Sequence, residues 1–294
     1  MKKIVKAPAK INLCLRVNGK KSNGYHDLSM VMQTISLFDT IEFTIERKDL
    51  ENQINLYCNQ PYIPTDDKNL VFKVVKYFFE RYGIDDNISI KLQKNIPTCG
   101  GLGGGSSDAA STILFLNEYY DLNLSLDELT SIASEFGSDI PFFIYGGECI
   151  CEGRGEIITK LNPFKDYFIV VATPNVRIST KNIFEKFDTI SIDSEDKIAK
   201  EEAFNNCLEA IKNRDIKLLS KNLFNDLEMV TEPMCDEVKI YKEKLVGYGA
   251  LSSLMSGSGS SVFGIFDSKE LALKCKEGMK NEFSSAFVYV AEPL

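Results

Sequence analysis

The sequence predicts an α+β fold, and three features of the chain point to it. Segments in which apolar and polar residues alternate, as in β-strands, occur at 10–17, 39–46 and 87–94. Segments with apolar residues at helical spacing lie among them, for example at 66–83 and 125–137. The two kinds of segment interleave in both halves without strict strand–helix–strand alternation, which favours α+β over a parallel α/β fold.

The first strand separates two kinds of side chain. Its apolar residues point one way: Ile11, Leu13, Leu15 and Val17. Lys10, Asn12 and Arg16 point the other way. A polar face of this kind is ordinary in a half-solvated sheet, but it would also aim an ammonium and an amide into a cleft. The Asn23-Gly24 pair in "SNGYHDL" predicts a turn after this strand.

Two helices have clear ends. "TDDKNLVFKVVKYFFERYG" predicts a helix with Asp66 or Asp67 near the N-cap and Gly83 as its stop. "SLDELTSIASEFG" predicts a second helix, which Ser125 and Glu128 begin as a capping box. An apolar stripe along the second helix predicts that one face is buried.

The second half begins after a pause at "LNPFKD", so we expect domains at 1–162 and 163–294. Strands are predicted at "YFIVVATP", "ALSSLM", "VFGIF" and "AFVYVA". Helices are predicted over roughly 180–187, 196–213, 215–246 and 268–282. The loop "SGSGSS" between two of these strands reads equally well as a hairpin turn or as a second glycine-rich binding loop.

Charge and composition exclude several classes of protein. Net charge is −8, from 34 basic and 42 acidic residues, which opposes a nucleic-acid or anionic-membrane surface. No apolar run approaches the roughly 18 residues of a membrane span, and lysines interrupt the N-terminal segment where a signal peptide would be apolar. We therefore expect a cytoplasmic protein with no nucleic-acid or membrane partner.

The eight cysteines are scattered, with no C-x-x-C pair, and the chain has one histidine. These counts disfavour a zinc site and predict reduced, mostly buried thiols, as in a cytosolic protein.

The stretch "IPTCGGLGGGSSDAAST" at 96–112 is the most informative one. A Gly/Ser-rich segment can be a flexible linker or a tight turn. This one runs directly into residues at helical spacing, and Ser106, Ser107 and Asp108 suit a helix N-terminus. Because the free N–H groups of a helix N-terminus bind anions, we favour a phosphate cradle.

Two known phosphate motifs do not fit this loop. Gly100 and Gly105 have P-loop spacing, but Ser106-Ser107 stands where the motif has a Lys-Ser/Thr pair, so its lysine is absent. The third glycine of G-x-G-x-x-G is also missing, since Ser106 occupies its place after Gly101 and Gly103. A cation for the phosphates must come from elsewhere in the chain.

The motifs together resemble the GHMP superfamily of small-molecule kinases over almost the full length. They are "PAKINLCLRV", "GYHDL", "MVMQTISLFD", "IPTCGGLGGGSSDAAS", "FGSDIPFFI" and "SGSGSSVFGIF", in the family's order and spacing. "PAKINL" with "GYH" resembles the members that use ATP to phosphorylate the 2-hydroxyl of a cytidine diphosphate derivative of methylerythritol, in the non-mevalonate isoprenoid route. The resemblance implies an N-terminal ATP-binding kinase domain related to a ribosomal-protein domain, a C-terminal α+β GHMP kinase domain, and an active site in the cleft between them.

The resemblance also implies roles for individual residues. Lys10 and Asp139 would be catalytic, as the phosphate cation and the acceptor of the hydroxyl proton. The substrate would contact Asn12, Tyr25, His26 and Phe184, with Tyr25 and Phe184 sandwiching the cytosine. ATP would contact Pro97, Thr98, Cys99, Gly100, Gly101, Leu102, Gly103, Gly104, Gly105, Ser106 and Ser107, together with Lys94 and Asn69 near the adenine. ATP chemistry implies Mg²⁺, for which Ser107 is a weak ligand candidate. We expect a monomer or weak homodimer.

Several residues have simpler readings. Without the resemblance, Lys10 reads as a solvated strand lysine and Asp139 as a cap for the segment that begins at Pro141. His26 reads as a turn residue, and Tyr25 and Phe184 as half-buried aromatics. Lys94 and Asn69 would by default lie on the surface.

Three other functions stay open. A related kinase could act on mevalonate, homoserine or a sugar, although "GYH" and the Tyr25/Phe184 pair oppose this. A nucleotide-binding regulator without catalysis would not need both Lys10 and Asp139. RNA binding fits the ribosomal-protein-like domain but not the acidic balance.

Overall fold

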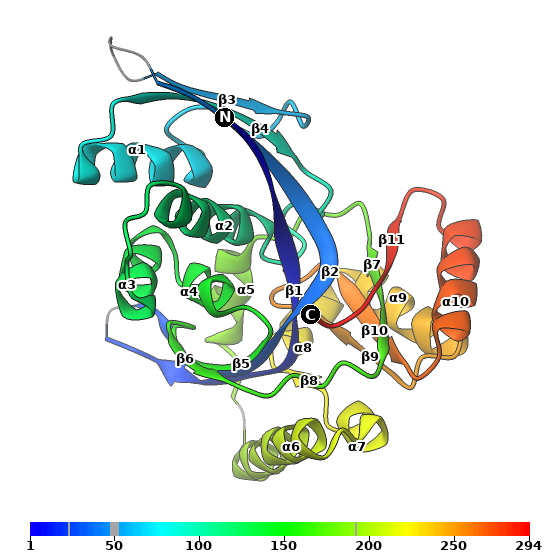
Figure 1. Ribbon diagram of the computed structural model, residues 1–294. Helices are drawn as coiled ribbons and strands as arrows, with labels where there is room; N and C mark the ends of the chain where they lie inside the picture. The colour runs from blue at the N-terminus through cyan, green and yellow to red at the C-terminus, as the bar shows by residue number, and fades with distance from the viewer. Residues whose placement is uncertain (23, 48–52, 192) are drawn as a thin grey trace. The chain divides into compact units, whose positions relative to one another are not determined.

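A computed structural model describes residues 1–22, 24–47, 53–191 and 193–294. Asn23, half of the predicted turn, lies outside the described residues. The chain forms two compact units (Figure 1). The first unit comprises Met1–Ala9, Leu37–Ile96 and Gly103–Tyr145, and the second comprises Lys10–Ser36, Pro97–Leu102 and Gly146–Leu294. The boundary between residues 162 and 163 stays a prediction.

Two long strands contribute residues to both units: β1 (Lys2–Lys20) and β2 (His26–Arg47). In the first unit, β4 (Asp86–Gln93) pairs antiparallel with β2, and β3 (Ile54–Cys58) pairs parallel with β4. In the second unit, β5 (Glu148–Gly153) pairs with β2, β6 (Ile157–Lys160) pairs with β5, and β8 (Phe224–Asn225) pairs parallel with β1.

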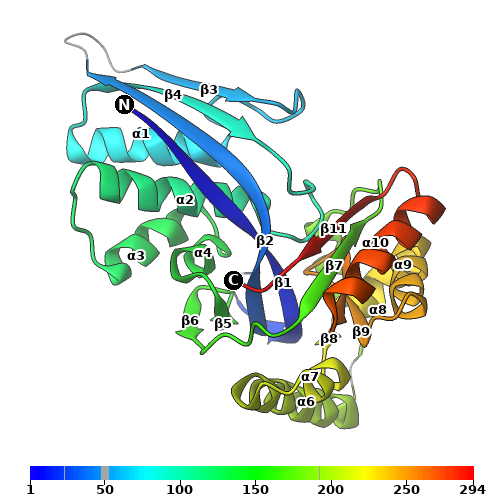
Figure 2. The same cartoon turned by 45° about the vertical axis from the view of Figure 1, so that its right-hand side comes forward.

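Helices of the first unit cover one face of its strands. They are α1 (Leu70–Tyr82), α2 (Gly104–Tyr119), α3 (Leu126–Phe136) and α4 (Ile140–Tyr145). Figure 2 shows α1 and α2 along the face of β3 and β4. Phe43 of β2 stacks on Phe115 of α2, with ring centroids 4.1 Å apart, and both side chains are buried. Burial of such large apolar side chains stabilises the unit and holds α2 in place.

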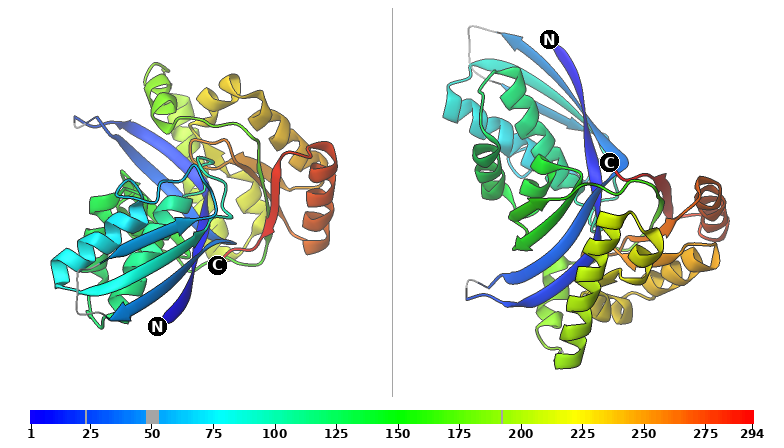
Figure 3. Two further views of the ribbon diagram at one scale, coloured as in Figure 1. Left: turned by 90° about the horizontal axis from the view of Figure 1, so that it is seen from above. Right: turned by 60° about the horizontal axis from the view of Figure 1, so that its bottom comes forward.

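The second unit contains a four-stranded antiparallel sheet in the order β11-β7-β10-β9. Its strands are β7 (Phe168–Thr173), β9 (Ser252–Met255), β10 (Val262–Phe266) and β11 (Phe287–Ala291). Helices α9 (Asp236–Gly247) and α10 (Lys269–Glu282) pack on it, as Figure 3 shows. The remaining elements are α5 (Thr180–Phe187), α6 (Ser194–Asn213), α7 (Ile216–Lys221), α8 (Glu228–Thr231) and a 3₁₀ helix at Glu232–Met234.

This arrangement confirms the α+β class and several element ends. The Ser125–Glu128 capping box is present, and Gly83 ends α1 in the left-handed conformation, with φ of 62°. Asn69 caps α1, so placing that cap near Asp66 or Asp67 was wrong. Its side chain accepts from the Val71 N–H at 2.9 Å and donates to the Pro64 carbonyl at 2.8 Å.

The predicted single helix over 215–246 is also wrong. The structure divides this segment into α7, β8, α8, the 3₁₀ helix and α9. Asn225 explains the interruption, because its amide donates to the carbonyls of Met255 and Gly257 and its oxygen accepts from the Leu227 N–H. These bonds to distant backbone replace the helical ladder, and helical periodicity in the sequence does not reveal them.

The polar face of β1 is buried at Lys10 and Asn12, whereas Arg16 is partly exposed. Lys10 is 4% exposed and Asn12 is 1% exposed, while the apolar face is buried as predicted. A strand lysine with its ammonium in water is therefore excluded for Lys10. A buried ammonium needs polar partners, and Lys10 Nζ donates to Asn12 Oδ1 at 2.5 Å.

Glu148 on β5 is a buried carboxyl group from which we expect a pH-dependent contribution to stability. Its side chain is fully buried, and burial raises its pKa from 4.5 to about 7. One carboxyl oxygen accepts from the Phe164 N–H at 2.9 Å. Within the described residues the other oxygen has no partner, nor has the amide oxygen of Gln33, which lies opposite on β2.

We expect Glu148→Gln to flatten the dependence of the unfolding free energy on pH. Because the folded-state pKa is raised, the stabilisation from Glu148 is full below about pH 4.5 and is lost as pH rises through about 7. From pH 5 to pH 8.5 the wild type should lose about 2–3 kcal/mol more than the variant. Urea unfolding at a series of pH values measures both curves, and parallel curves would contradict a buried, protonated Glu148.

Candidate active site

The glycine-rich loop has the backbone that a phosphate cradle needs. Cys99, Gly101 and Gly103 all have positive φ, at 58°, 76° and 70°. Gly103 is the N-cap of α2, and no side chain of the described residues caps this end of the helix. The first N–H groups of α2 are thus left available for an anion, and the helix dipole favours negative charge there.

A buried ion cluster lies beneath the start of α2. The Lys94 ammonium contacts the carboxylates of Asp39 and Asp108, and all three residues are buried. Asp39 also accepts from the backbone N–H groups of Asn95 at 2.5 Å and Ile96 at 2.8 Å. Burial raises the pKa of Asp108, partly offset by the Lys94 charge. The cluster fixes the segment before the loop to the first turn of α2.

Lys94 therefore lies in the protein interior and not on the surface. A Cβ on Gly104 would lie 3.2 Å from Lys94 Nζ, so the ammonium sits directly behind the loop backbone. Asn69 uses both polar atoms of its side chain in the α1 cap. Contact of either residue with adenine stays a prediction.

The second glycine-rich loop packs on the first half of the phosphate loop. β9 and β10 form an antiparallel hairpin around it, as one of the two readings predicted. The Ser261 N–H donates to the Gly100 carbonyl at 3.1 Å, and the Ser256 hydroxyl donates to the Gly101 carbonyl at 3.0 Å. A Cβ on Gly101 would overlap the Ser256 carbonyl, so only glycine permits this approach. The hairpin loop thus sets the conformation of the phosphate loop.

Lys10 lies against both loops. Its backbone N–H donates to the Leu102 carbonyl at 3.0 Å, and its Nζ lies 3.2 Å from the point where a Cβ of Gly257 would be. Asn12 donates to the sulfur of Met30 at 3.5 Å. The Lys10 ammonium is thus held beside the hairpin loop, and its role as the cation for the transferred phosphate stays a prediction.

Asp139 lies in the turn before α4 and is half-buried. Among the described residues its carboxylate makes no hydrogen bond or ion pair, so the reading of Asp139 as a helix cap finds no support. Asp139 and Lys10 belong to different compact units, and their joint action stays a prediction.

Three aromatic residues of the predicted substrate site have defined neighbours in the second unit. The His26 ring stacks on Phe184, with centroids 4.6 Å apart and planes at 26°. Tyr25 is 55% exposed, and the Arg154 guanidinium lies 5.1 Å from its ring centre. The exposed face of Tyr25 can accept a planar base, whereas His26 covers one face of Phe184. The sandwich of cytosine between Tyr25 and Phe184 stays a prediction.

Ser107, the weak candidate for a Mg²⁺ ligand, lies near the start of α2. Its hydroxyl is buried and has no hydrogen-bond partner within the described residues. Within all the residues that the structure describes, no three His, Cys, Asp or Glu side chains converge to hold a metal ion. A role of Ser107 as a ligand of Mg²⁺ stays a prediction.

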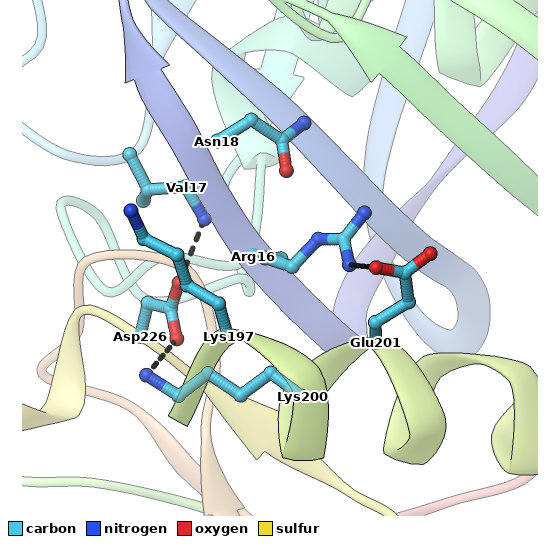
Figure 4. A pocket seen from close by; sticks show the side chains of 7 residues that line it. All are labelled: Arg16, Val17, Asn18, Lys197, Lys200, Glu201 and Asp226. Carbon is cyan, nitrogen blue, oxygen red and sulfur yellow. Dashed lines mark hydrogen bonds and ion pairs between the residues drawn. The ribbon is translucent and has the colours of Figure 1, made fainter. Parts of the chain in front are cut away.

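A cavity of about 220 Å³ lies elsewhere in the second unit (Figure 4). The residues lining it are Arg16, Val17, Asn18, Lys197, Lys200, Glu201 and Asp226. Asp226 accepts from the Val17 N–H at 2.8 Å and pairs with Lys200 at 2.7 Å, so it ties β1 to α6. The structure describes all of the predicted site residues, and none of them lines this cavity.

The sequence did not reveal Asp39, Asn225 or Asp188, and it indicated Asp108 only as a residue suited to a helix N-terminus. Asp39 and Asp108 are buried partners of Lys94, and Asn225 holds the hairpin loop near Lys10. Asp188 bonds His26 from 162 residues away. No local pattern marks these residues, because their partners are distant in the chain.

Known families match both halves of the chain. The family model of the GHMP kinase N-terminal domain matches residues 69–147, and that of the GHMP kinase C-terminal domain matches 207–285. Together they cover more than half of the chain. The chain belongs to the GHMP kinase family.

Curated relatives of this GHMP kinase match it over nearly its full length. A protein of Clostridium botulinum named 4-diphosphocytidyl-2-C-methyl-D-erythritol kinase is 41% identical over 284 residues, which is 97% of this chain and 98% of the relative. A protein of Clostridium tetani with the same name is also 41% identical, with the same coverage.

Solved structures agree with the fold of this kinase. A crystal structure of 4-(cytidine 5'-diphospho)-2C-methyl-D-erythritol kinase matches with a TM-score of 0.78 and 28% identity, covering 99% of both chains. Homoserine kinase from Cytophaga hutchinsonii matches with a TM-score of 0.79 and 20% identity, covering 99% of this chain and 94% of that one. The second similarity shows the fold alone.

Proposed function

We propose that this kinase transfers the γ-phosphoryl group of ATP to the 2-hydroxyl of 4-(cytidine 5'-diphospho)-2-C-methyl-D-erythritol, giving the 2-phosphate and ADP. The reaction belongs to the non-mevalonate route of isoprenoid precursor biosynthesis. The observation that carries the proposal is the full-length similarity, at 41% identity, to relatives that bear the name of this activity.

The phosphate loop supports the ATP side of the reaction. In the loop from Pro97 to Ser107, the residues after Pro97 supply backbone N–H groups, and the uncapped α2 N-terminus adds its dipole. The conformation is preformed, since the hairpin loop and the Lys94 cluster hold the two ends of the loop. A preformed cradle loses little free energy to ordering when the phosphates bind.

Lys10 and Asp139 perform the chemistry in this proposal. The Lys10 ammonium neutralises charge that develops on the transferring phosphoryl group. Asp139 accepts the proton of the 2-hydroxyl, or orients that hydroxyl for attack. Bound Mg²⁺, with Ser107 as a candidate ligand, would neutralise charge on the β- and γ-phosphates.

The substrate side rests on Tyr25, His26, Phe184 and Asn12. Tyr25 and Phe184 stack on the cytosine, and His26 reads its polar edge. Asn12, bonded to Lys10, orients the reacting end of the substrate. We place the reaction in the cytoplasm, which the eight free thiols support. In the described residues, no helix has the length and apolar character of a membrane span.

A panel of acceptors tests this function against its rivals. The protein is incubated with ATP and Mg²⁺ and one acceptor at a time, and ADP release is followed. We expect rapid turnover with the cytidine diphosphate substrate and little with mevalonate or homoserine. A preference for mevalonate, homoserine or a sugar would instead assign the chain to another GHMP kinase activity.

Removal of the cytosine contacts should weaken the substrate and not ATP. Stacking on an aromatic face is worth about 1–3 kcal/mol per base, so Tyr25→Ala or Phe184→Ala should raise KM for the cytidine substrate about 10-fold or more. KM for ATP should hardly change. Methylerythritol 4-phosphate, which lacks the nucleotide, should be a very poor acceptor because binding energy from the nucleotide also positions the hydroxyl.

Tyr57→Ala is the matched control for these kinetics. Tyr57 lies on β3 in the first unit and is 58% exposed, close to the 55% of Tyr25. We expect wild-type kinetics for this variant. Equal rates with methylerythritol 4-phosphate and with the full substrate would show that the nucleotide is not recognised.

A further inference from the structure

We propose that Asp188 holds His26 in the tautomer with its proton on Nε2, and that this choice makes the kinase select cytosine over uracil. The proposal rests on the proposed function, since it concerns how the same site reads its nucleotide. Asp188 acts through His26 and is therefore a positioning residue.

The contact between the two side chains defines the tautomer. His26 Nε2 lies 2.6 Å from Asp188 Oδ1. An ionised carboxylate only accepts hydrogen bonds, so Nε2 must be the donor in this pair. In a neutral imidazole the other nitrogen, Nδ1, then carries a lone pair and can only accept.

Lys20 keeps Asp188 in the required state. Its ammonium lies 2.5 Å from Asp188 Oδ2, so the two carboxylate oxygens have separate partners. The hydrogen bond from His26, followed by that from Lys20, lowers the pKa of Asp188 and keeps it ionised. With the Lys20 ammonium on one carboxylate oxygen, the other oxygen of Asp188 is left to accept from His26 Nε2.

The orientation of the ring is fixed as well. The His26 side chain is only 9% exposed, and its ring stacks on Phe184. Rotation that exchanged the two nitrogens would break the bond to Asp188. Among the described residues, Nδ1 has no hydrogen-bond partner. The ring therefore presents one acceptor nitrogen at the position where the substrate base is proposed to bind.

An acceptor at this point distinguishes the two pyrimidines. Cytosine carries an amino group at C4, which donates to Nδ1. Uracil carries a carbonyl oxygen at C4, which is also an acceptor. This oxygen would face the lone pair of Nδ1, and neither acceptor would have a donor. A mismatch of this kind lowers kcat/KM by about 10- to 100-fold, whereas stacking alone tolerates either base.

The tautomer can be measured directly because His26 is the only histidine in the chain. A long-range ¹H–¹⁵N NMR spectrum of the ligand-free protein reports which imidazole nitrogen carries the proton. We expect the Nε2–H form in the wild type and a mixture of forms in Asp188→Ala. A wild-type spectrum of the Nδ1–H form would overturn the proposal.

Selectivity is measured in parallel, as the ratio of kcat/KM for the cytidine substrate to that for its uridine analogue. In Asp188→Ala the ratio should fall about 10-fold, through KM of the cytidine substrate, while KM for ATP stays unchanged. Asp188→Asn serves as a second variant in case Asp188→Ala folds poorly. Its side chain keeps the size of the carboxylate and can donate to Nε2, so this variant should also lower the ratio. An unchanged ratio in a folded variant would overturn the proposal.

Asp27→Ala is the matched control, because the Asp27 carboxylate lies in the same region but contacts Lys21, at 2.8 Å, and Asn18. It should leave both the spectrum and the ratio unchanged.

The two measurements also separate this proposal from the proposed function. A wild-type protein that shows the Nε2–H form but does not phosphorylate the cytidine substrate would refute the function and, with it, the selectivity.

Discussion

Asp139→Asn is expected to lower kcat by on the order of 10²-fold or more, with a much smaller effect on KM for either substrate. The amide has the size of the carboxylate but cannot accept the hydroxyl proton. Since the described residues show no hydrogen bond or ion pair of Asp139, the substitution breaks no structural contact. Stability should therefore match the wild type, which thermal unfolding would verify.

Lys10→Ala should produce a loss of similar size in kcat, and the double variant should be about as slow as the slower single variant. Residues that act as a unit give such non-additive losses. Asp127→Asn, on the exposed first turn of α3, is the control and should keep wild-type kcat. A kcat within a few-fold of wild type for Asp139→Asn would remove Asp139 from the mechanism.

Gly105→Val is expected to weaken ATP binding by at least about 10-fold without destabilising the fold. A Cβ at Gly105 meets no atom within 4 Å, and the residue lies in the exposed first turn of α2. A side chain there fills space over the free N–H groups, where a phosphate would bind. Calorimetric titration with ATP measures the effect, and thermal unfolding measures stability.

Neighbouring glycines should also be required for ATP binding, but their variants would perturb the fold. Gly103 has a positive φ, so Gly103→Val is strained. A Cβ on Gly104 would lie within 3.1–3.3 Å of Ile96, Lys94 and Asp39. Gly247→Val is the control for Gly105→Val. Gly247 occupies an equally open helical position on α9, far along the chain from the glycine-rich loop. Unchanged ATP affinity in Gly105→Val would contradict the phosphate cradle.

Local features of this chain were predictable from the sequence because their causes are local. Alternation over 10–17 placed a strand, and Ser125 with Glu128 marked a helix start that the structure reproduces. The start of α2 directly after the glycine-rich loop was also predictable, since the glycines precede residues at helical spacing. In each case the residues that determine the conformation lie within a few positions of one another.

Features set by distant contacts were not predictable in this way. Asn225 interrupts the expected helix by bonding to Gly257, 32 residues further on. Asp226 accepts from the Val17 N–H across 209 residues. The charge cluster of Lys94, Asp39 and Asp108 looks like surface charge in the sequence, and only tertiary packing makes it a buried support for the loop.

The central claim is that this GHMP kinase phosphorylates a hydroxyl of a cytidine diphosphate substrate, and phosphorus NMR of the product tests it most directly. The protein is incubated with ATP, Mg²⁺ and 4-(cytidine 5'-diphospho)-2-C-methyl-D-erythritol. We predict one new phosphomonoester resonance, from a phosphate on the 2-oxygen. The cytidine diphosphate linkage should stay intact, and ADP should form in equal amount. ADP without a new monoester, or a monoester formed only on another acceptor, would contradict the claim.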